Sequence, residues 1–334
     1  MSKPTKRVIG RGERVVPGVW RLRLPLPWPG VPHCNAWAVA AGGGVVLVDT
    51  GMHQPGSFGH LERALQQVNL RVENVRLVVC THAHSDHCGE APAIAERAGC
   101  EVWVHANHAH HSSAAGDPDQ ALARRAEVAR QSGVPEEPIR RWLEQRRDAG
   151  TGVAGTLSPD RDLVDGVVVD TDLGPWTVVE TPGHAPSHVC LHQPDRRLLL
   201  SGDHLLGRVS LYFEYGFSPD PVQELLDSLD RVERLDVRLA LAGHGRPFTD
   251  IAAHIEANRA LVRQRLHAVR SGLAERSCTA FDLAPRVYGT AFAPASAPFL
   301  LNKLLCYLTH LERKGEAVRF EPDEQTAERW AVAA

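Results

Sequence analysis

The chain has 334 residues, of which 43% are hydrophobic and 23% are charged, with a formal net charge of −3 at pH 7. A chain of this length can bury a sizeable core and exceeds one average domain, so we expect one large domain and a smaller one. The composition argues against a polyanion binder and a disordered chain, and no apolar run approaches the roughly 20 residues needed to cross a bilayer.

The N-terminus and the cysteines bear on localisation. Residues 1–7 include basic side chains, but no apolar segment follows them, so we expect no signal peptide. The seven cysteines are scattered without a C-x-x-C pair, which favours reduced thiols in a cytoplasmic protein. Cys88, directly after a histidine cluster, is interpreted as a small buried hydrophobic residue, and a place near a metal is the alternative.

The chain begins with strand patterns. Residues 19–24 alternate apolar and polar side chains, as a half-buried strand does, and residues 36–39 predict a second strand. Residues 24–30, between them, are predicted to form a proline-rich loop.

The run 81–87, with the sequence THAHSDH, is the most informative feature and directly follows the apolar run 77–80. It holds four metal-binding side chains within six residues: His82, His84, Asp86 and His87. Neutral imidazoles and a carboxylate suit Zn²⁺ and similar divalent ions. A polar loop that holds histidines by accident is the alternative.

The same local pattern recurs along the chain: an apolar strand, a small or glycine-containing turn, and a side chain that can bind metal. It places Asp49, His184, Asp203 and His244 after the apolar runs 45–48, 176–179, 198–200 and 239–241. Glycine in such turns lets the backbone bend sharply and approach an ion closely.

Helical patterns alternate with the strands. Residues 58–68 and 91–98 predict amphipathic helices, and residues 101–105 predict a strand, which fits two sheets sandwiched between helices. Residues 107–150 are interpreted as a helical insertion placed to form a lid over the cleft. Its first residues include His108, His110 and His111, which we interpret as a solvated helix start, with a third metal site as the alternative.

Aromatic residues follow Asp203, in the segment 207–221. Tyr212 and Tyr215 are candidate pocket residues, and core packing explains the same rings equally well. After residue 247, helical stripes cover 251–269 and 300–311, and residues 317–320 predict a short strand.

This ordered set of motifs resembles the metallo-β-lactamase superfamily over roughly residues 15 to 250. The resemblance implies one ion bound by His82, His84 and His184, and a second bound by Asp86, His87 and His244, with Asp203 bridging both. It also implies that Asp49 fixes the orientation of the imidazoles. The equivalent of residues 24–30 overhangs the metals in this family, which makes Trp28 a candidate substrate contact.

The resemblance implies an α/β fold, an αββα metallo-β-lactamase sandwich with a helical insertion at residues 107–150. We expect residues 1–250 to form the catalytic domain and residues 251–334 a small, mostly helical domain. The latter is similar to the winged-helix tail of one branch of the family. Because it holds eleven Lys/Arg against nine Asp/Glu, we interpret it as a structural cap or oligomer contact and not as a DNA-binding domain.

The expected chemistry is hydrolysis by a hydroxide held between two divalent ions, with Zn²⁺ favoured and Fe or Mn²⁺ as alternatives. Asp86 would orient that hydroxide or carry its proton. We expect a small-molecule substrate, namely an ester, thioester, lactone or activated aryl ester or ether, with no nucleic acid or membrane partner. An endoribonuclease is the alternative. A β-lactamase is disfavoured because those enzymes generally lack the equivalent of Asp203, and a non-catalytic binding subunit is disfavoured because every ligand is present.

Overall fold

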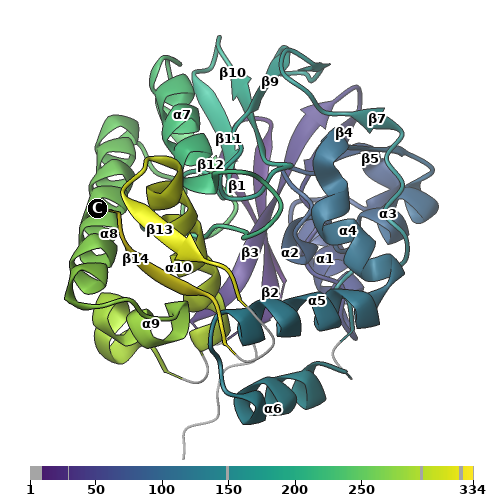
Figure 1. Cartoon of the computed structure of the whole chain (residues 1–334). Coiled ribbons are helices and arrows are strands. Elements are labelled where there is room, and N and C mark those ends of the chain that lie inside the picture. Colours follow the sequence, from purple (N-terminus) through teal and green to yellow (C-terminus); the bar gives the residue numbers. More distant parts are fainter. Residues whose placement is uncertain (1–9, 29, 148–149, 294–295, 323–325, 334) are drawn as a thin grey trace, which may run out of the picture.

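The computed structural model describes residues 10–28, 30–147, 150–293, 296–322 and 326–333 of the chain. Its centre consists of two β-sheets that lie face to face (Figure 1). The first sheet has seven strands in chain order: β1 (Arg11–Val16), β2 (Val19–Trp28), β3 (Val31–Ala41), β4 (Gly44–Val48), β5 (Val75–Val79), β6 (Glu101–Val104) and β7 (Arg161–Asp162). The second sheet has five, in the order β12 (Leu239–Ala242), β11 (Leu198–Gly202), β10 (Val189–Gln193), β9 (Trp176–Glu180) and β8 (Val168–Val169).

Strand direction brings several strand ends to one edge of the sandwich. β4 and β5 pair in parallel in the first sheet, and β11 and β12 pair in parallel in the second. Parallel neighbours have their carboxyl ends at the same edge of a sheet. At this edge the Val189 amide donates to the Thr81 carbonyl (2.8 Å), which joins the two sheets directly. The turns that carry the predicted ligands therefore open on a common edge.

Helices cover the outer face of each sheet (Figure 1). The first sheet carries α1 (Ser57–Gln66), α2 (Ser85–Cys88) and α3 (Ala91–Ala98), and the second carries α7 (Pro221–Glu233), α8 (Ile251–Glu275), α9 (Ala280–Tyr288) and α10 (Ala297–Arg313). Three-residue 3₁₀ helices span 72–74, 106–108 and 289–291. The order helix, sheet, sheet, helix confirms the predicted αββα sandwich.

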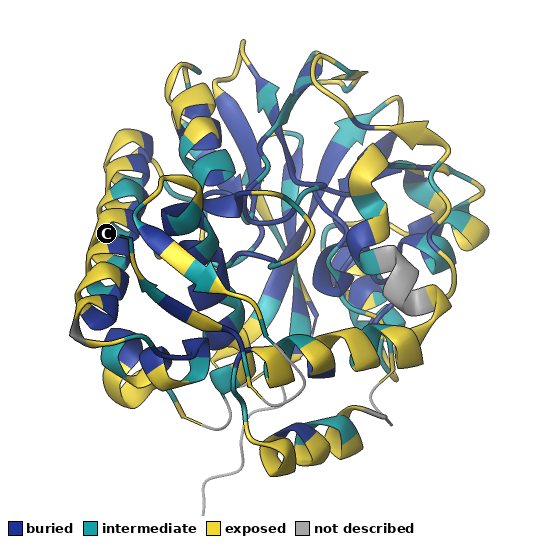
Figure 2. Cartoon of the chain, in the orientation of Figure 1, coloured by how far each residue is buried: buried dark blue, intermediate teal, exposed yellow. Residues whose placement is uncertain are grey.

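Buried apolar side chains form three cores, one between the sheets and one beneath each helical layer (Figure 2). Trp37 of β3 and Trp176 of β9, both 1% exposed, fill the space between the sheets. Truncating a buried ring of this size to alanine typically costs about 3–5 kcal/mol. This rigid sandwich holds the strand ends, and hence the turns after them, in fixed positions.

The predicted insertion forms three helices, α4 (Ala109–Gly116), α5 (Pro118–Gln131) and α6 (Glu136–Arg147). The Asp117 side chain accepts a hydrogen bond from the Gln120 amide and so caps α5. Arg124 donates to the Gly216 carbonyl (2.9 Å), and its guanidinium lies 4.6 Å from the centre of the Phe217 ring. The insertion therefore rests on the segment that follows β11.

The C-terminal segment packs onto the second sheet without a separate core. Side chains of α8, α9 and α10 share one apolar cluster with Leu199 of β11 and with α7. The chain ends in an antiparallel pair, β13 (Ala317–Phe320) and β14 (Arg329–Val332), where Trp330 is fully buried. The expected helices and the strand at 317–320 are present.

The prediction of a proline-rich loop at residues 24–30 was wrong. β2 and β3 extend through most of this segment as a long hairpin, with Pro25 paired to His33 and a register shift before Trp28. β1 pairs with β2 only as far as Arg23, so Pro25 lies where that edge of β2 has no strand partner among the described residues. Proline, which lacks an N–H, is tolerated at such an open edge.

Two predictions made from the sequence concern localisation, one about membrane-spanning segments and one about the N-terminus. Within the described ranges, no helix is long and apolar enough to span a membrane. The basic N-terminal residues 1–7 lie outside those ranges.

Candidate metal centre

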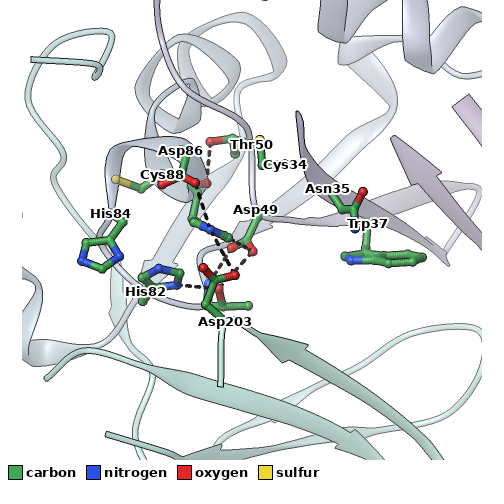
Figure 3. Close-up of polar contacts among 12 residues, drawn as sticks. Cys34, Asn35, Trp37, Asp49, Thr50, His82, His84, Asp86, Cys88 and Asp203 are labelled. Carbon is green, nitrogen blue, oxygen red and sulfur yellow. Dashed lines mark hydrogen bonds and ion pairs between the residues drawn. The ribbon is translucent and has the colours of Figure 1, made fainter. Parts of the chain in front are cut away.

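The structure brings the seven predicted ligand residues together at the shared edge of the sandwich. Figure 3 labels His82, His84, Asp86 and Asp203 of this set. Four of the seven come from the turn and short helix after β5, and one each from the turns after β9, β11 and β12. Their ligand atoms form a first group of His82, His84 and His184 and a second group of Asp86, His87 and His244, and a further group of His82, His87 and Asp203 overlaps both. Within each group these atoms lie within 4.8 Å of one another.

The first group is formed by three imidazoles. His84 Nδ1 lies 3.0 Å from His184 Nε2, and the ring centre of His82 lies 4.6 Å from that of His84. Burial, followed by the charge of His84, lowers the pKa of His184 to about 3, and burial lowers the pKa of His82. Burial thus favours the neutral form of both rings, which is the form that binds metal.

The second group combines imidazoles with a carboxylate. Asp86 Oδ2 lies 3.2 Å from His244 Nε2 and 3.5 Å from His87 Nε2. Burial alone would lower the pKa of His244, but the carboxylates of Asp203 and Asp86 outweigh it and raise that pKa to about 10. The site thus attracts positive charge, as expected of a cation site.

Asp203 stands between the two groups. Its Oδ1 lies 3.5 Å from His87 Nε2, and its Oδ2 lies 3.3 Å from His244 Nε2 and 3.8 Å from His184 Nε2. Burial opposes its charge, yet His244 and His87 hold the pKa of Asp203 well below its usual range. One carboxylate therefore faces ligand atoms of both groups.

Asp49 anchors the turn beneath these ligands (Figure 3). It accepts hydrogen bonds from the Thr81 amide (2.7 Å) and hydroxyl (3.0 Å), and its Oδ2 lies 2.8 Å from His87 Nδ1. This contact fixes the His87 ring so that Nε2 points to the other ligands. Asp49 also adopts φ 63°, a left-handed conformation that side chains other than Asn and Asp rarely adopt.

The turn that carries His244 is held from β3. Asn35 Nδ2 donates to the carbonyls of Ala242 (2.8 Å) and Gly245 (3.0 Å), and His244 Nδ1 lies 3.0 Å from the His33 carbonyl. A Cβ on Gly243 would lie 2.7 Å from His87 Cε1 and closer still to an oxygen of Asp203. Only glycine fits at this approach of backbone to ligands.

The buried polar atoms test whether an ion fits. His82 Nε2, His87 Nε2 and Asp203 Oδ1 are buried and make no hydrogen bond within the described part of the chain. Buried polar atoms are normally paired, because an unpaired one costs about 1–3 kcal/mol. Nitrogen and oxygen atoms that converge without donors between them fit a divalent cation.

Sequence reasoning missed two groups beside the centre. His188 accepts a hydrogen bond from the Asp203 amide (3.0 Å) and contacts Thr181. His188 lies four residues after His184 and directly before β10, and this spacing of two histidines in the sequence could have indicated a role beside the centre. Glu214 Oε1 lies 3.2 Å from His84 Nε2, and Glu214 also contacts His110.

The interpretation of the insertion's first histidines as a solvated helix start was therefore wrong for His110. Its side chain is buried because α4 packs toward the centre, where the ring contacts Glu214 and Ser187. The ring centre of His111 lies 5.5 Å from that of His84.

The candidate pocket residues differ in position. The ring centre of Tyr212 lies 5.9 Å from that of His84 and 5.6 Å from that of His184, beside the first group. Tyr215 packs against the C-terminal core. Trp28, 37% exposed, lies at the tip of the β2–β3 hairpin.

Cys88 is a buried thiol that donates to the Ala83 carbonyl (3.2 Å). Burial raises its pKa, so the side chain is a neutral thiol, as its interpretation as a small buried residue requires. All seven cysteines are free.

An αββα sandwich with His and Asp side chains clustered at one edge is an architecture that can hold metal ions. The profile of the family described as the metallo-beta-lactamase superfamily matches residues 29–244, and the chain belongs to this superfamily. It is 28% identical over 316 residues to the probable metallo-hydrolase YqjP of Bacillus subtilis, covering 92% of this chain and 94% of that protein.

The chain is also similar to a second curated protein over a shorter range and to a solved structure over most of its length. The chain is 26% identical over 222 residues to the acyl-coenzyme A thioesterase MBLAC2 of Homo sapiens, covering 65% of this chain and 74% of that protein. A metallo-beta-lactamase family protein of Thermus thermophilus superposes with a TM-score of 0.80 at 27% identity, covering 95% of this chain and 99% of that structure.

Proposed function

We propose that the chain is a dinuclear, zinc-dependent hydrolase of a small ester, thioester, lactone or activated aryl ester or ether. The observation that carries the proposal is the position of Asp203, whose two oxygens face imidazoles of both ligand groups. A ligand set made only of nitrogen and oxygen favours Zn²⁺, with Fe or Mn²⁺ as the other candidates.

Two divalent ions in such a site polarise a carbonyl and lower the pKa of water toward neutrality. The chain's own contribution is geometry: His82, His84 and His184 would hold one ion, Asp86, His87 and His244 the other, and Asp203 would touch both. Asp86 Oδ2 faces the same space as Asp203, close to His244 Nε2, so it is placed to orient an attacking water and accept its proton.

An aromatic wall beside the first group supports a substrate with an acyl or aryl group. Phe299 of α10 stacks on Tyr212, with ring centres 4.8 Å apart and planes at 15°, and Phe299 is 46% exposed. Asn302 donates to the Tyr212 hydroxyl (3.3 Å), which fixes the ring. Apolar walls with few fixed polar groups are typical of small-molecule sites. Because MBLAC2 is named an acyl-coenzyme A thioesterase, a thioester is the first substrate to test.

The proposal extends to the rest of the chain. The order of α8, α9, α10 and the β13–β14 hairpin supports a winged-helix-like C-terminal segment, which we propose acts as a structural cap or as a homo- or hetero-oligomer contact. We further propose a cytoplasmic protein without nucleic acid or membrane partners. An endoribonuclease is the second candidate, but the net charge of −3 does not favour a phosphate-binding channel.

A substrate panel tests the proposal. Zinc-loaded protein is assayed with an acyl thioester, a chromogenic ester, a lactone and single-stranded RNA, each at low and moderate salt. We expect turnover of at least one of the small substrates with modest salt dependence, because ion polarisation and apolar contacts carry binding. His84→Ala should abolish that turnover. The matched control His192→Ala, whose ring lies 3.3 Å from the Asp236 carbonyl and outside the ligand groups, should not.

The opposite pattern would overturn the proposal. Phosphate contacts made by Lys or Arg weaken steeply as salt rises. Efficient, salt-sensitive RNA cleavage that His84→Ala abolishes would therefore establish the nuclease in place of the small-substrate hydrolase.

A further inference from the structure

A buried acid outside the predicted ligand set lies against His84. Glu214, 7% exposed, follows β11, and its Oε1 lies 3.2 Å from His84 Nε2. The other ring nitrogen, His84 Nδ1, lies 3.0 Å from His184 Nε2. The two nitrogens of His84 thus have different surroundings: Nδ1 faces the ligands of the first group, and Nε2 faces Glu214.

Glu214 is itself held by a chain of buried contacts that returns to the ligand turn. Its Oε2 lies 2.5 Å from His110 Nδ1 of α4, and His110 Nε2 lies 2.7 Å from the Ser187 hydroxyl. The Ser187 hydroxyl oxygen in turn accepts a hydrogen bond from the amide of Ala83 (3.1 Å), the residue before His84. This series of contacts therefore begins and ends at the turn that carries His84.

One arrangement of protons satisfies every member of this loop. If Nδ1 of His84 binds an ion, its proton is on Nε2 and is donated to Glu214. His110 then donates from Nδ1 to the other oxygen of Glu214 and accepts at Nε2 from the Ser187 hydroxyl. That hydroxyl oxygen accepts from the Ala83 amide. In this arrangement each ring nitrogen of the two histidines, each oxygen of Glu214 and the Ser187 hydroxyl has a partner.

A third ion is the competing explanation for these atoms. His84 Nε2, His110 Nδ1 and Glu214 Oε2 lie close enough to hold one, and their ring N–H directions do not meet strict hydrogen-bond angles. Distance decides between the two. Tetrahedral ligand bonds of about 2.0–2.1 Å place two ligand atoms about 3.3 Å apart. At 2.5 Å, the separation of His110 Nδ1 and Glu214 Oε2 is shorter than that spacing and lies nearer to the range of about 2.7–2.9 Å of a charge-assisted hydrogen bond.

We propose that Glu214 is a positioning residue that holds His84 in the tautomer and orientation required to bind the first ion through Nδ1. His110 and Ser187 fix Glu214 from the insertion and from the turn after β9. The inference rests on the proposed dinuclear centre and adds a residue that none of its motifs contains. It also gives the insertion a role, because α4 supplies His110.

Metal affinity tests the inference independently of turnover. Glu214→Gln keeps the shape of the side chain and removes its charge, and Glu224→Gln in α7 is the matched control. The full chain is loaded with Zn²⁺, and each variant is titrated with a chromogenic chelator. We expect one of two bound equivalents to weaken by about 10–100-fold in Glu214→Gln, with the other unchanged and the control equal to wild type. The visible spectrum of the Co²⁺-loaded protein should change in the same variant only.

A second variant tests the inference if Glu214→Gln fails to fold, which circular dichroism would reveal. His110→Phe removes one contact of Glu214 and should weaken the same equivalent by a smaller factor. Wild-type affinity for both ions in Glu214→Gln and His110→Phe would refute the inference. The inference would also be refuted if the wild-type protein bound a third equivalent of Zn²⁺ and Glu214→Gln lost that equivalent. Fewer than two ions in the wild type would instead refute the dinuclear centre on which the inference rests.

Discussion

Replacing Asp49 with asparagine is expected to weaken the metal centre while leaving the fold intact. Asp49 is 1% exposed and accepts hydrogen bonds from the Thr81 amide and hydroxyl, and its Oδ2 lies 2.8 Å from His87 Nδ1. Asparagine tolerates the left-handed conformation at φ 63°, so the backbone can remain in place. Its amide cannot accept the proton of His87 Nδ1 where Oδ2 now does.

The magnitude follows from that single contact. A hydrogen bond to a charged group is worth about 1.5–3 kcal/mol, and each 1.4 kcal/mol is a factor of ten in affinity. The loss therefore corresponds to about 10–150-fold, which agrees with the 10–100-fold typical of residues that orient metal-binding histidines. The ion held by Asp86, His87 and His244 should carry this loss, because His87 is the imidazole that Asp49 contacts.

Chelator competition on the zinc-loaded protein measures the affinities, and thermal unfolding with excess chelator measures the fold alone. Asp49→Ala is the comparison, since alanine at positive φ adds a backbone cost of roughly 1–2 kcal/mol that asparagine avoids. We expect the alanine variant to melt lower than the asparagine variant at similar metal affinity. Wild-type affinity for both ions in Asp49→Asn would refute the assigned role of Asp49.

Three further predictions concern the ions and the fold. Protein purified without chelator should contain about two equivalents of metal by elemental analysis, and chelation should lower its melting temperature because ions that bind only the folded state stabilise it; one equivalent at full activity would contradict the dinuclear site. Asp203→Ala should lose one ion and most turnover together, a larger loss of metal than Asp49→Ala, and unchanged stoichiometry would show the ligand assignment to be wrong. Burial opposes the charge of Asp220, but hydrogen bonds from His310 and the Gln223 amide hold the pKa of Asp220 below its ordinary value. The stability that Asp220 adds is therefore complete above its unfolded pKa of about 3.9 and is lost as the pH falls through the lower folded value, so the difference in unfolding free energy between wild type and Asp220→Asn should be constant at neutral pH and shrink below about pH 4.

The elements and ligands that sequence reasoning predicted share a local signal. An apolar run followed by a small or glycine-containing turn marks a buried strand and its exit, so Asp49, His184, Asp203 and His244 could each be placed without knowing the rest of the chain. Parallel pairing of β4 with β5 and of β11 with β12 then brings the exits of these strands to one edge. β9 runs in the same direction as β11, because both are antiparallel to β10, so His184 emerges at that edge too. The αββα layers follow from the alternation along the chain of strand segments, whose side chains repeat every two residues, with helical segments, whose side chains repeat about every 3.6 residues.

What sequence reasoning missed depends on contacts between distant segments. Glu214 lies within an aromatic run without strand or helix periodicity, and its partners His84 and His110 come from other elements. No local pattern distinguishes this acid from a solvated one. The strand at Pro25 was missed for a related reason, since its tolerance of proline depends on how far β1 extends along β2.

The distance along the chain between ligands has a consequence for how the protein acquires its ions. His84 and His184 are 100 positions apart, and His244 lies further on, after β12. The first four proposed ligands emerge from the ribosome early, but neither proposed ligand set is complete until side chains that follow strands of the second sheet have joined them. If the proposed dinuclear centre forms, metal uptake and assembly of the sandwich should therefore be one event in biosynthesis. A nascent chain stalled before β9, which lacks His184, Asp203 and His244, should exchange added Zn²⁺ freely with a competing chelator, whereas the finished protein should retain it.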